Sequence, residues 1–498
     1  MKEPSTADLP LSDPIEPPST SDGSPAAAPR AEREFSGSNP GGNGRPRRQG
    51  RGGRRGRGGA HRRSRRGYFG NNNNESEGGG GADAESQSQN SDRDTAVLED
   101  AGSSGQGPEG SDLAQPNRER KRDIPVGPAV EGEGLLEVSS KGFGFLRLAA
   151  SGFKQAPNDI FVTPEMVRTF GLRDGMWIKG MVREGQRGPQ LCELISVCGK
   201  NPEEAKSFPF FEELTAINPN KRIILETRAN LYTTRVVDLV TPVGRGQRGL
   251  IVAPPRTGKT TLLQQMAEAV YHNHESMKIF VLLVDERPEE VTELTRALPF
   301  AEVMASSNDQ EVKSHTRIAQ LAIERAKRLV EAGEHVFLLL DSITRLARAF
   351  NNSMKNDKRG ISKGGLAVGA LEMPRRLFAA ARNTREAGSL TIVGTALVQT
   401  NSKMDESIFQ EFKGTGNLEL VLDRKIAEQY VWPAVNIHAS GTRREELLLP
   451  KHHLEKIHVI RRGLAGHKPV EAIQRLLSLM ERFPNNAQMM LELKASAA

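Results

Sequence analysis

The chain has 498 residues, a formal net charge of +7, 36% hydrophobic residues and 5% aromatic residues. Globular chains usually contain about 45% apolar residues, so we do not expect all of this chain to form a packed core. There is no apolar run of about 18 residues and no apolar segment close to Met1, so we expect neither a membrane span nor secretion. The two cysteines, Cys192 and Cys198, lack zinc-site spacing and are too few for a disulfide scaffold, which favours a cytoplasmic protein with reduced thiols.

Residues 1–133 form a low-complexity tail that we predict to be disordered. The tail carries 19 Lys and Arg against 21 Asp and Glu, a net charge of −2, whereas residues 134–498 carry 50 against 41, a net charge of +9. Periodic apolar residues are almost absent from it, so burial could not offset the chain entropy lost on folding. Within it, residues 45–66 contain 11 arginines and no acid. This arginine block indicates loose electrostatic binding to nucleic-acid phosphates, and the alternative is a solubilising linker with acidic flanks.

Residues 134–200 have the strand pattern of a small β-barrel. Short apolar runs alternate there with glycines, and four or five strands at such spacing are typical of small barrels. The runs that indicate strands are residues 134–148, 159–162, 176–182 and 191–197.

A pair of phenylalanines marks the candidate RNA-binding face of this barrel. Phe143 and Phe145 are two residues apart and therefore on one face of a strand, where the neighbouring glycines leave room for a base to stack. Lys141 and Arg147 flank the pair and can meet phosphates. The alternative is that both rings fill the barrel. The stretch resembles oligonucleotide-binding (OB) barrels of the cold-shock type, in which such a pair stacks on bases, and this resemblance adds Phe161 in the next strand.

The pattern of an apolar strand, a tight loop and a helix follows at residues 248–264. Residues 253–260 match the phosphate-binding loop (P-loop), with Ala253 in place of its first glycine. In such loops the amides and the helix N-terminus cradle phosphates, while Lys259 reaches the β- and γ-phosphates and Thr260 can hold Mg²⁺. The predicted nucleotide-binding residues are Pro254, Pro255, Arg256, Thr257, Gly258, Lys259, Thr260 and Thr261.

Two further runs of buried-strand type end in carboxylates. Residues 279–284 lead to Glu286, and residues 336–340 lead to Asp341. Because these runs alternate with helical patterns, they indicate an α/β fold with parallel strands, in which ligands bind at the carboxyl ends of the strands. We expect Asp341 on the Mg²⁺ side of the nucleotide, and Glu286 can orient and deprotonate the attacking water. Helix capping is the alternative role of such acids, and we retain it for Asp285, Glu289 and Glu290.

Two basic loops that contain glycine or small polar residues follow in the sequence. One spans residues 358–365, and the other spans residues 400–405 after a strand-like run at residues 389–397. Neither has enough apolar residues to pack firmly. A solvated surface loop is the default interpretation of each, and gripping of a polymer beside the ATPase core is the functional alternative.

Six motifs distributed along the chain are shared with one family. They are residues 142–147, 242–255, 285–292, 340–348, 411–417 and 441–447. Together, and in this order, they resemble the Rho family of bacterial transcription termination factors. The resemblance implies a RecA-like P-loop ATPase core with C-terminal helices over residues 231–498, joined by a connector over residues 201–230 to an OB or cold-shock-like barrel.

The resemblance also implies an activity. The family forms ring-shaped homohexamers that load on nascent single-stranded RNA, hydrolyse ATP with Mg²⁺ at subunit interfaces and translocate 5′ to 3′ to dislodge RNA polymerase, with transcription factors as further partners. By position, Glu286 is the catalytic carboxylate, Asp341 the Walker B acid and Arg443 an arginine finger that reaches the neighbouring site. Trp432 matches the aromatic residue that stacks on adenine, and Arg256 occupies a basic position of the family. The central-channel RNA loops correspond to Arg359, Lys363, Gly364, Gly365, Ser402 and Lys403.

The chain departs from the family pattern at several places. The tail replaces the small helical subdomain that usually precedes the barrel. Leu191 stands where an aromatic residue of the pyrimidine pocket is expected, so a preference for cytosine stays open. The first channel loop is one residue longer, which leaves Arg359 and Lys363 as competing RNA contacts, and Tyr430 replaces an expected basic residue. A rotary-ATPase-like or RecA-like ATPase and an RNA-binding protein without motor activity are the alternative functions.

Overall fold

The computed structural model describes residues 127–185, 188–354, 360–361 and 364–493, which all belong to one compact unit spanning residues 112–498. The arginine block at residues 45–66 and nearly all of the predicted tail lie outside the described residues. The first strand begins at Val130, inside the predicted tail and not at residue 134. No helix in the described part of the chain is long and apolar enough to cross a membrane.

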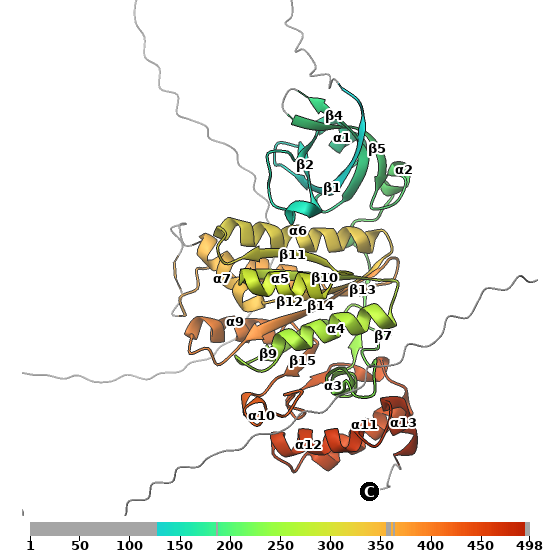
Figure 1. Cartoon of the computed structure of the whole chain (residues 1–498), viewed down its shortest axis with the longest axis vertical. Coiled ribbons are helices and arrows are strands. Elements are labelled where there is room, and N and C mark those ends of the chain that lie inside the picture. The colour runs from blue at the N-terminus through green and yellow to red at the C-terminus, as the bar shows by residue number, and fades with distance from the viewer. Residues whose placement is uncertain (1–126, 186–187, 355–359, 362–363, 494–498) are drawn as a thin grey trace, which may run out of the picture. The chain divides into compact units, whose positions relative to one another are not determined.

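Five strands near the start of the described residues close into a barrel in the order β1-β2-β3-β5-β4 (Figure 1). The elements are β1 (Val130–Val138), β2 (Gly144–Arg147), η1 (Ala149–Ser151), β3 (Ile160–Val162), α1 (Pro164–Thr169), β4 (Trp177–Gly185) and β5 (Gly188–Val197). Alternate strand residues point inward, and Leu136, Leu146, Val162 and Ile178 are fully buried in the barrel core. The predicted barrel is therefore confirmed.

After the barrel, the chain forms a mostly parallel sheet with the strand order β11-β10-β12-β14-β9-β15-β16. Its strands are β9 (Arg248–Ala253), β10 (Met277–Glu286), β11 (Glu302–Ser307), β12 (His335–Asp341), β14 (Ser389–Leu397), β15 (Leu418–Val421) and β16 (Gly441–Thr442). The pairings from β11 to β15 are all parallel, whereas β16 runs antiparallel to β15. This arrangement confirms the predicted α/β fold.

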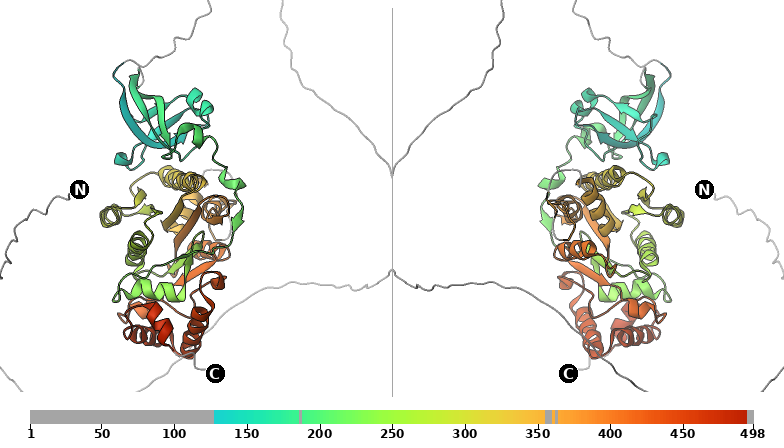
Figure 2. Two further views of the ribbon diagram at one scale, coloured as in Figure 1. Left: turned by 90° about the vertical axis from the view of Figure 1, so that its right-hand side faces the viewer. Right: turned by 90° about the vertical axis from the view of Figure 1, so that its left-hand side faces the viewer.

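Helices cover both faces of the sheet (Figures 1 and 2). Along β10, Ile279, Val281 and Leu283 join one core cluster, and the intervening Phe280 and Leu282 join the other. The first cluster holds residues of α3 (Tyr232–Val240), α4 (Lys259–Asn273) and α5 (Pro288–Ala297). The second holds residues of α6 (Val312–Glu331), α7 (Ile343–Met354), α8 (Glu372–Ala379) and α9 (Lys403–Lys413). Burial on both faces explains why the strand runs are continuously apolar.

The segment between barrel and sheet contributes short elements to the core. They are α2 (Pro202–Ala205), η2 (Phe211–Glu213), β6 (Ala216–Ile217), β7 (Arg222–Ile223) and β8 (Val243–Gly244). Strand β6 pairs with β13 (Arg382–Thr384), which in turn pairs with β14, so the predicted connector extends the sheet. The chain ends in α10 (Arg424–Ala427), η3 (Glu445–Leu447), α11 (Lys451–Leu464), α12 (Pro469–Met480) and α13 (Asn486–Glu492).

Helix α6 carries the contacts between the barrel and the sheet. The Arg173 guanidinium lies 2.8 Å from the carboxylate of Glu331, whose side chain is fully buried. The Arg317 guanidinium donates to Glu137 of β1 at 3.0 Å. These charge-assisted hydrogen bonds join β1 and the segment after α1 to one helix of the core.

Candidate nucleotide site and RNA-binding face

The P-loop joins the end of β9 to the start of α4. The Thr257 hydroxyl donates a 2.7 Å hydrogen bond to the Pro254 carbonyl, which folds the loop on itself. Gly258 has a φ of +76°, and a Cβ there would lie 2.8 Å from the ring of Trp432, so a glycine is required. Because α4 begins at Lys259, its unpaired N-terminal amides follow the loop directly. The local geometry is that of an anion-binding loop.

Three of the predicted catalytic and phosphate-binding side chains meet at the carboxyl edge of the sheet. The Lys259 Nζ lies 2.7 Å from Asp341 Oδ1 and 3.7 Å from Glu286 Oε1. Asp341 also accepts a 2.8 Å hydrogen bond from the Thr395 hydroxyl. Glu286 is 1% exposed, and the Arg345 Nε of α7 lies 3.1 Å from its carboxylate. Strands β10 and β12 are adjacent in the sheet, so their ends bring the two carboxylates together.

The environment of Glu286 suits a general base. Its pKa is raised to about 7, mainly by burial and then by the negative charge of Asp341. The positive charges of Lys259 and Arg345 lower the pKa and offset part of this rise. Neither carboxylate oxygen of Glu286 accepts a hydrogen bond from the described residues. A carboxylate with a pKa close to neutral pH and free lone pairs can accept a proton from a bound water.

A β-bulge aims Glu286 at the site. The pairing of β10 with β11 shifts register between Val284 and Glu286, and Asp285 adopts a left-handed φ of 57°. The Arg345 guanidinium donates to the Asp285 carbonyl and so fixes the bulge. Asp285 therefore sits in the bulge and does not cap the next helix, which corrects that alternative; Glu289 and Glu290 do lie in the first turn of α5.

The site also has ligands suited to Mg²⁺. Thr260 is the second residue of α4, and Asp341 supplies a carboxylate beside Lys259. Hydroxyl and carboxylate oxygens are the ligands that Mg²⁺ prefers, together with waters and phosphate oxygens. Among the described residues, no group of three or more His, Cys, Asp and Glu forms a closed metal cage. A cation held largely by the nucleotide fits these residues.

A pocket lies beside the P-loop. We call it the Trp432 pocket; it has a volume of 230 Å³ and is lined by Thr233, Thr257, Gly258, Thr261, Leu262, Gln265, Leu422, Trp432, Pro433 and Ala434. Trp432 is 46% exposed and lies over Gly258, so the predicted adenine-stacking residue and the P-loop share one pocket. An aromatic face beside a phosphate site can stack on a base.

Arg443 lies apart from this cluster. It follows β16, its backbone amide donates to the Asn417 carbonyl at 2.9 Å, and its side chain is exposed. Burial, and then the charges of Arg382 and Arg443, lower the pKa of Arg248, so these arginines lie near one another. In the described part of the chain, Arg443 makes no ion pair.

The barrel presents three phenylalanine rings together. The ring centroids of Phe143 and Phe145 are 5.7 Å apart, those of Phe143 and Phe161 are 5.8 Å apart, and those of Phe145 and Phe161 are 5.7 Å apart. All three rings are half-buried and lie outside the barrel core cluster, so they do not fill the barrel. Lys141 is exposed in the turn before them. We call these three rings the aromatic platform.

The structure corrects the role predicted for Arg147. This residue is 7% exposed, its Nε lies 2.6 Å from Glu137, and its Nη1 pairs with Asp159. Its guanidinium also lies 5.1 Å from the centroid of the Phe145 ring. Two carboxylates occupy the donors that a phosphate would need, so Arg147 supports the platform and is not a free phosphate contact.

The strand register also corrects the interpretation of Leu191. Leu191 is 1% exposed and belongs to the barrel core. Its neighbour Gln190 pairs with Phe161 across β3 and β5. Because side chains alternate along a strand, Gln190 and not Leu191 is the residue beside the platform. Neither residue is aromatic.

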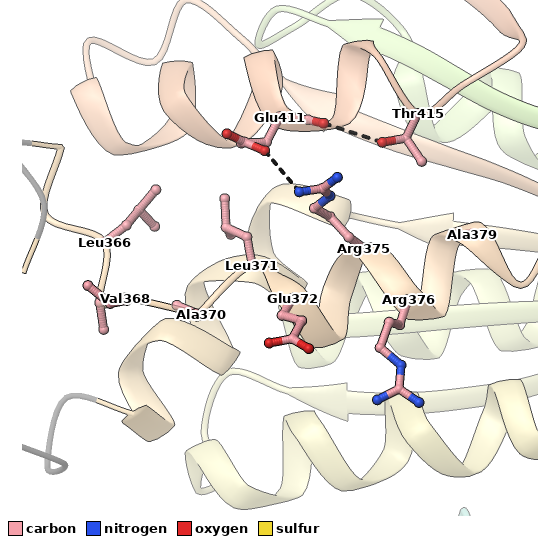
Figure 3. A pocket seen from close by; sticks show the side chains of 12 residues that line it. Leu366, Val368, Ala370, Leu371, Glu372, Arg375, Arg376, Ala379, Glu411 and Thr415 are labelled. Carbon is pink, nitrogen blue, oxygen red and sulfur yellow. Dashed lines mark hydrogen bonds and ion pairs between the residues drawn. The ribbon is translucent and has the colours of Figure 1, made fainter. Parts of the chain in front are cut away.

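The channel loops are only partly described. Arg359 and Lys363 lie outside the described residues, whereas the Gly365 carbonyl accepts a 3.2 Å hydrogen bond from Asn351 of α7. Ser402 caps the N-terminus of α9, and Lys403 is exposed in its first turn. A pocket of 600 Å³ lies beside these loops between α8 and α9, with the Arg375 and Glu411 pair at its rim (Figure 3).

Several residues of these sites were not singled out from the sequence. Arg345 lies on α7, and its partners Glu286 and Asp285 are about 60 residues earlier in the sequence, so no local pattern pointed to it. Three others lie beside residues that are distant in sequence, so only the fold reveals them. Thr395 donates to Asp341, Gln190 pairs with Phe161, and Gln265 lines one pocket with Trp432.

A P-loop on a parallel sheet with two carboxylates at the strand ends, joined to a barrel with an aromatic face, defines a RecA-type nucleotide-binding protein with an attached RNA-binding barrel. Residues 132–203 match the RNA-binding domain of Rho termination factor, and residues 233–442 match the nucleotide-binding domain of the ATP synthase alpha/beta family. The chain is 47% identical over 384 residues to transcription termination factor Rho of Pseudomonas aeruginosa, which covers 74% of this chain and 91% of that protein. It is 45% identical over 365 residues to Rho of Rhodopirellula baltica, covering 72% of this chain and 71% of that protein. It is also 45% identical over 369 residues to Rho of Aquifex aeolicus, a match that covers 73% of this chain and 84% of that protein. The chain belongs to the transcription termination factor Rho family.

Proposed function

We propose that the chain is an RNA-dependent ATPase that works as a ring-shaped homohexamer, translocates on nascent single-stranded RNA in the cytoplasm and terminates transcription by displacing RNA polymerase. The observation that carries the proposal is the buried Glu286 carboxylate, which lies beside Lys259 and Asp341 at the end of the sheet and accepts no hydrogen bond from the part of the chain that the structure describes. The match of residues 132–203 to an RNA-binding domain supports RNA as the polymer.

The chemistry follows from these residues. Lys259 exchanges its ion pair with Asp341 for the β- and γ-phosphates of ATP, which frees the carboxylate. Mg²⁺, held by Thr260 and Asp341, would neutralise phosphate charge when bound. Glu286 takes a proton from a water whose oxygen attacks the γ-phosphorus, while the bond to the β-phosphate bridging oxygen breaks and ADP leaves. Arg345 contacts both Glu286 and the Asp285 carbonyl and thus keeps the base in place.

The position of Arg443 supports the oligomer. A transition state of phosphoryl transfer gains stability from an arginine that neutralises the developing charge. Arg443 is exposed on the segment after the edge strand β16 and does not contact its own chain's Lys259 or Glu286. It completes a neighbouring site, and closing such head-to-tail contacts produces a ring.

RNA engages the motor at two places in this proposal. The aromatic platform stacks on bases of the loaded RNA, and Lys141 contacts its backbone. The loops with Gly364, Gly365, Ser402 and Lys403 grip the strand, and their movement with the state of the nucleotide produces translocation and unwinding of RNA–DNA duplexes.

The test is hydrolysis of ATP by the full chain with single-stranded RNA, with single-stranded DNA and without polymer. The proposal predicts strong stimulation by RNA, and equal rates in all three reactions contradict it. A transcription reaction with a purified bacterial RNA polymerase then reads out termination, with Glu286→Gln as the inactive control. If the wild-type chain yields only full-length transcripts, the proposed termination activity is contradicted, whereas the proposed RNA-dependent ATPase activity is not.

A further inference from the structure

The Trp432 pocket contains a buried amide whose oxygen has no partner among the residues that the structure describes. Gln265 lines this pocket together with Trp432, and its Oε1 is buried without a hydrogen bond in the described residues. Thr261 and Leu262 lie four and three residues before it on α4, so the three side chains share the face of the helix that borders the pocket.

No other side chain that lines the pocket donates a hydrogen bond to that oxygen, although Thr233 and Thr261 bring hydroxyls to the pocket. Leu262, Leu422 and Ala434 are buried apolar residues that line the same pocket. The Thr257 hydroxyl is already used, because it donates to the Pro254 carbonyl. A buried amide oxygen without a donor is destabilising and is rare in native proteins, so this one calls for a group that arrives from outside.

We propose that Gln265 selects the base of the nucleotide by accepting a hydrogen bond from the 6-amino group of adenine. This inference rests on the proposed ATPase function and deepens it. With the phosphates at Lys259 and a base against Trp432, the pocket that holds Gln265 is the place for the base edge. Adenine carries an amino donor at C6, whereas hypoxanthine and guanine carry an acceptor oxygen there, which faces the Gln265 oxygen unfavourably. Gln265 is thus a specificity-determining residue, separate from the stacking by Trp432.

The experiment uses three triphosphates that differ at C6 of the purine, with inosine also carrying a hydrogen on N1. They are ATP, inosine triphosphate with an oxygen at C6, and purine riboside triphosphate with hydrogen at C6. We expect the wild-type chain to have a KM about tenfold lower for ATP than for purine riboside triphosphate, with inosine triphosphate the poorest substrate. Gln265→Leu should raise the KM for ATP by the same factor and leave both kcat and the KM for purine riboside triphosphate unchanged.

The matched control is Gln264→Leu. Gln264 is the same residue type on the same helix, does not line the pocket, and donates to Glu268 at 2.8 Å. The Gln264→Leu variant should have the wild-type KM for each of the three triphosphates. A Gln265→Leu variant that raises the KM for ATP and purine riboside triphosphate equally would reduce Gln265 to a structural role. Equal KM values in the wild-type chain, or a preference for inosine triphosphate, overturn the proposal even if the variant does not fold.

Failure of the ATPase function itself is distinguishable from failure of this inference. If the wild-type chain hydrolyses none of the triphosphates with RNA, the proposed function fails. Isothermal titration calorimetry with the same three triphosphates then decides the inference by binding alone. A dissociation constant that is about tenfold lower for ATP than for purine riboside triphosphate supports the role of Gln265, and equal constants reject it.

Discussion

The RNA-binding barrel and the nucleotide site each gather two cations and two carboxylates, but they use them differently. In the barrel, Glu137 accepts hydrogen bonds from Arg147 at 2.6 Å and from Arg317 at 3.0 Å. In the nucleotide site, Glu286 lies beside Lys259 and an arginine yet accepts no hydrogen bond from the described residues. In the barrel cluster Glu137 is satisfied and helps to hold an aromatic surface in place, although one oxygen of Asp159 has no partner among the described residues. In the core cluster both oxygens of Glu286 stay available for chemistry. What distinguishes Glu286 among the described carboxylates is that both of its buried oxygens lack a hydrogen-bond donor.

The largest effect is expected where the core cluster needs a group from another subunit. Arg443→Ala should lower RNA-stimulated kcat about a thousandfold while the ring stays assembled, because only transition-state charge stabilisation is lost. Steady-state hydrolysis and analytical ultracentrifugation measure the two properties. Arg444→Ala is the matched control, because Arg444 is an exposed neighbour that already pairs with Glu446. A variant ring that turns over at the wild-type rate would contradict an intersubunit role of Arg443.

A smaller effect is expected at the aromatic platform. Phe145→Ala should weaken RNA binding by about 1–3 kcal/mol through lost stacking and leave nucleotide affinity unchanged. Fluorescence anisotropy with labelled single-stranded RNA measures the first quantity, and nucleotide titration measures the second. Phe210→Ala is the control, since Phe210 is 52% exposed outside the platform. Equal losses for both variants would show that Phe145 has no special contact with RNA.

The pH dependence sharpens the comparison within the core. The pKa of Glu286 is raised to about 7, and the base works only when it is deprotonated. Therefore kcat/KM should be level above about pH 7.5 and fall roughly tenfold per pH unit below about pH 6.5. Glu286→Gln should remove this limb together with the activity. A profile that stays flat down to pH 5 contradicts the assignment of Glu286 as the base.

The smallest effect on turnover is expected from the arginine block at residues 45–66. Deleting its 11 arginines should weaken RNA binding and reduce the slope of log affinity against log salt, because fewer phosphate counterions are released. Turnover at saturating RNA should stay unchanged. Anisotropy titrations across several salt concentrations measure the slope. If affinity, slope and termination are all unchanged, the block is only a spacer.

Local patterns predicted much of the fold and half of the site. The P-loop, the strand ends at Glu286 and Asp341 and the barrel all follow from short sequence signals, because each depends on neighbouring residues. The role of Arg147 was missed because its partners come from other segments, Glu137 from β1 and Asp159 from the loop before β3. Gln190, and not Leu191, lies beside the platform, and this was missed because only strand pairing fixes which side of β5 faces Phe161. Register and buried ion pairs are properties of the assembled fold.

The division between the two sites has one direct test. RNA affinity and hydrolysis at saturating RNA are measured for Phe145→Ala and Glu286→Gln in parallel with the wild-type chain. The account predicts that Glu286→Gln binds RNA normally and loses turnover by about 10²–10⁴-fold, whereas Phe145→Ala needs more RNA but reaches nearly the wild-type kcat. Retained turnover in Glu286→Gln, or lost turnover in Phe145→Ala with RNA bound, would contradict it.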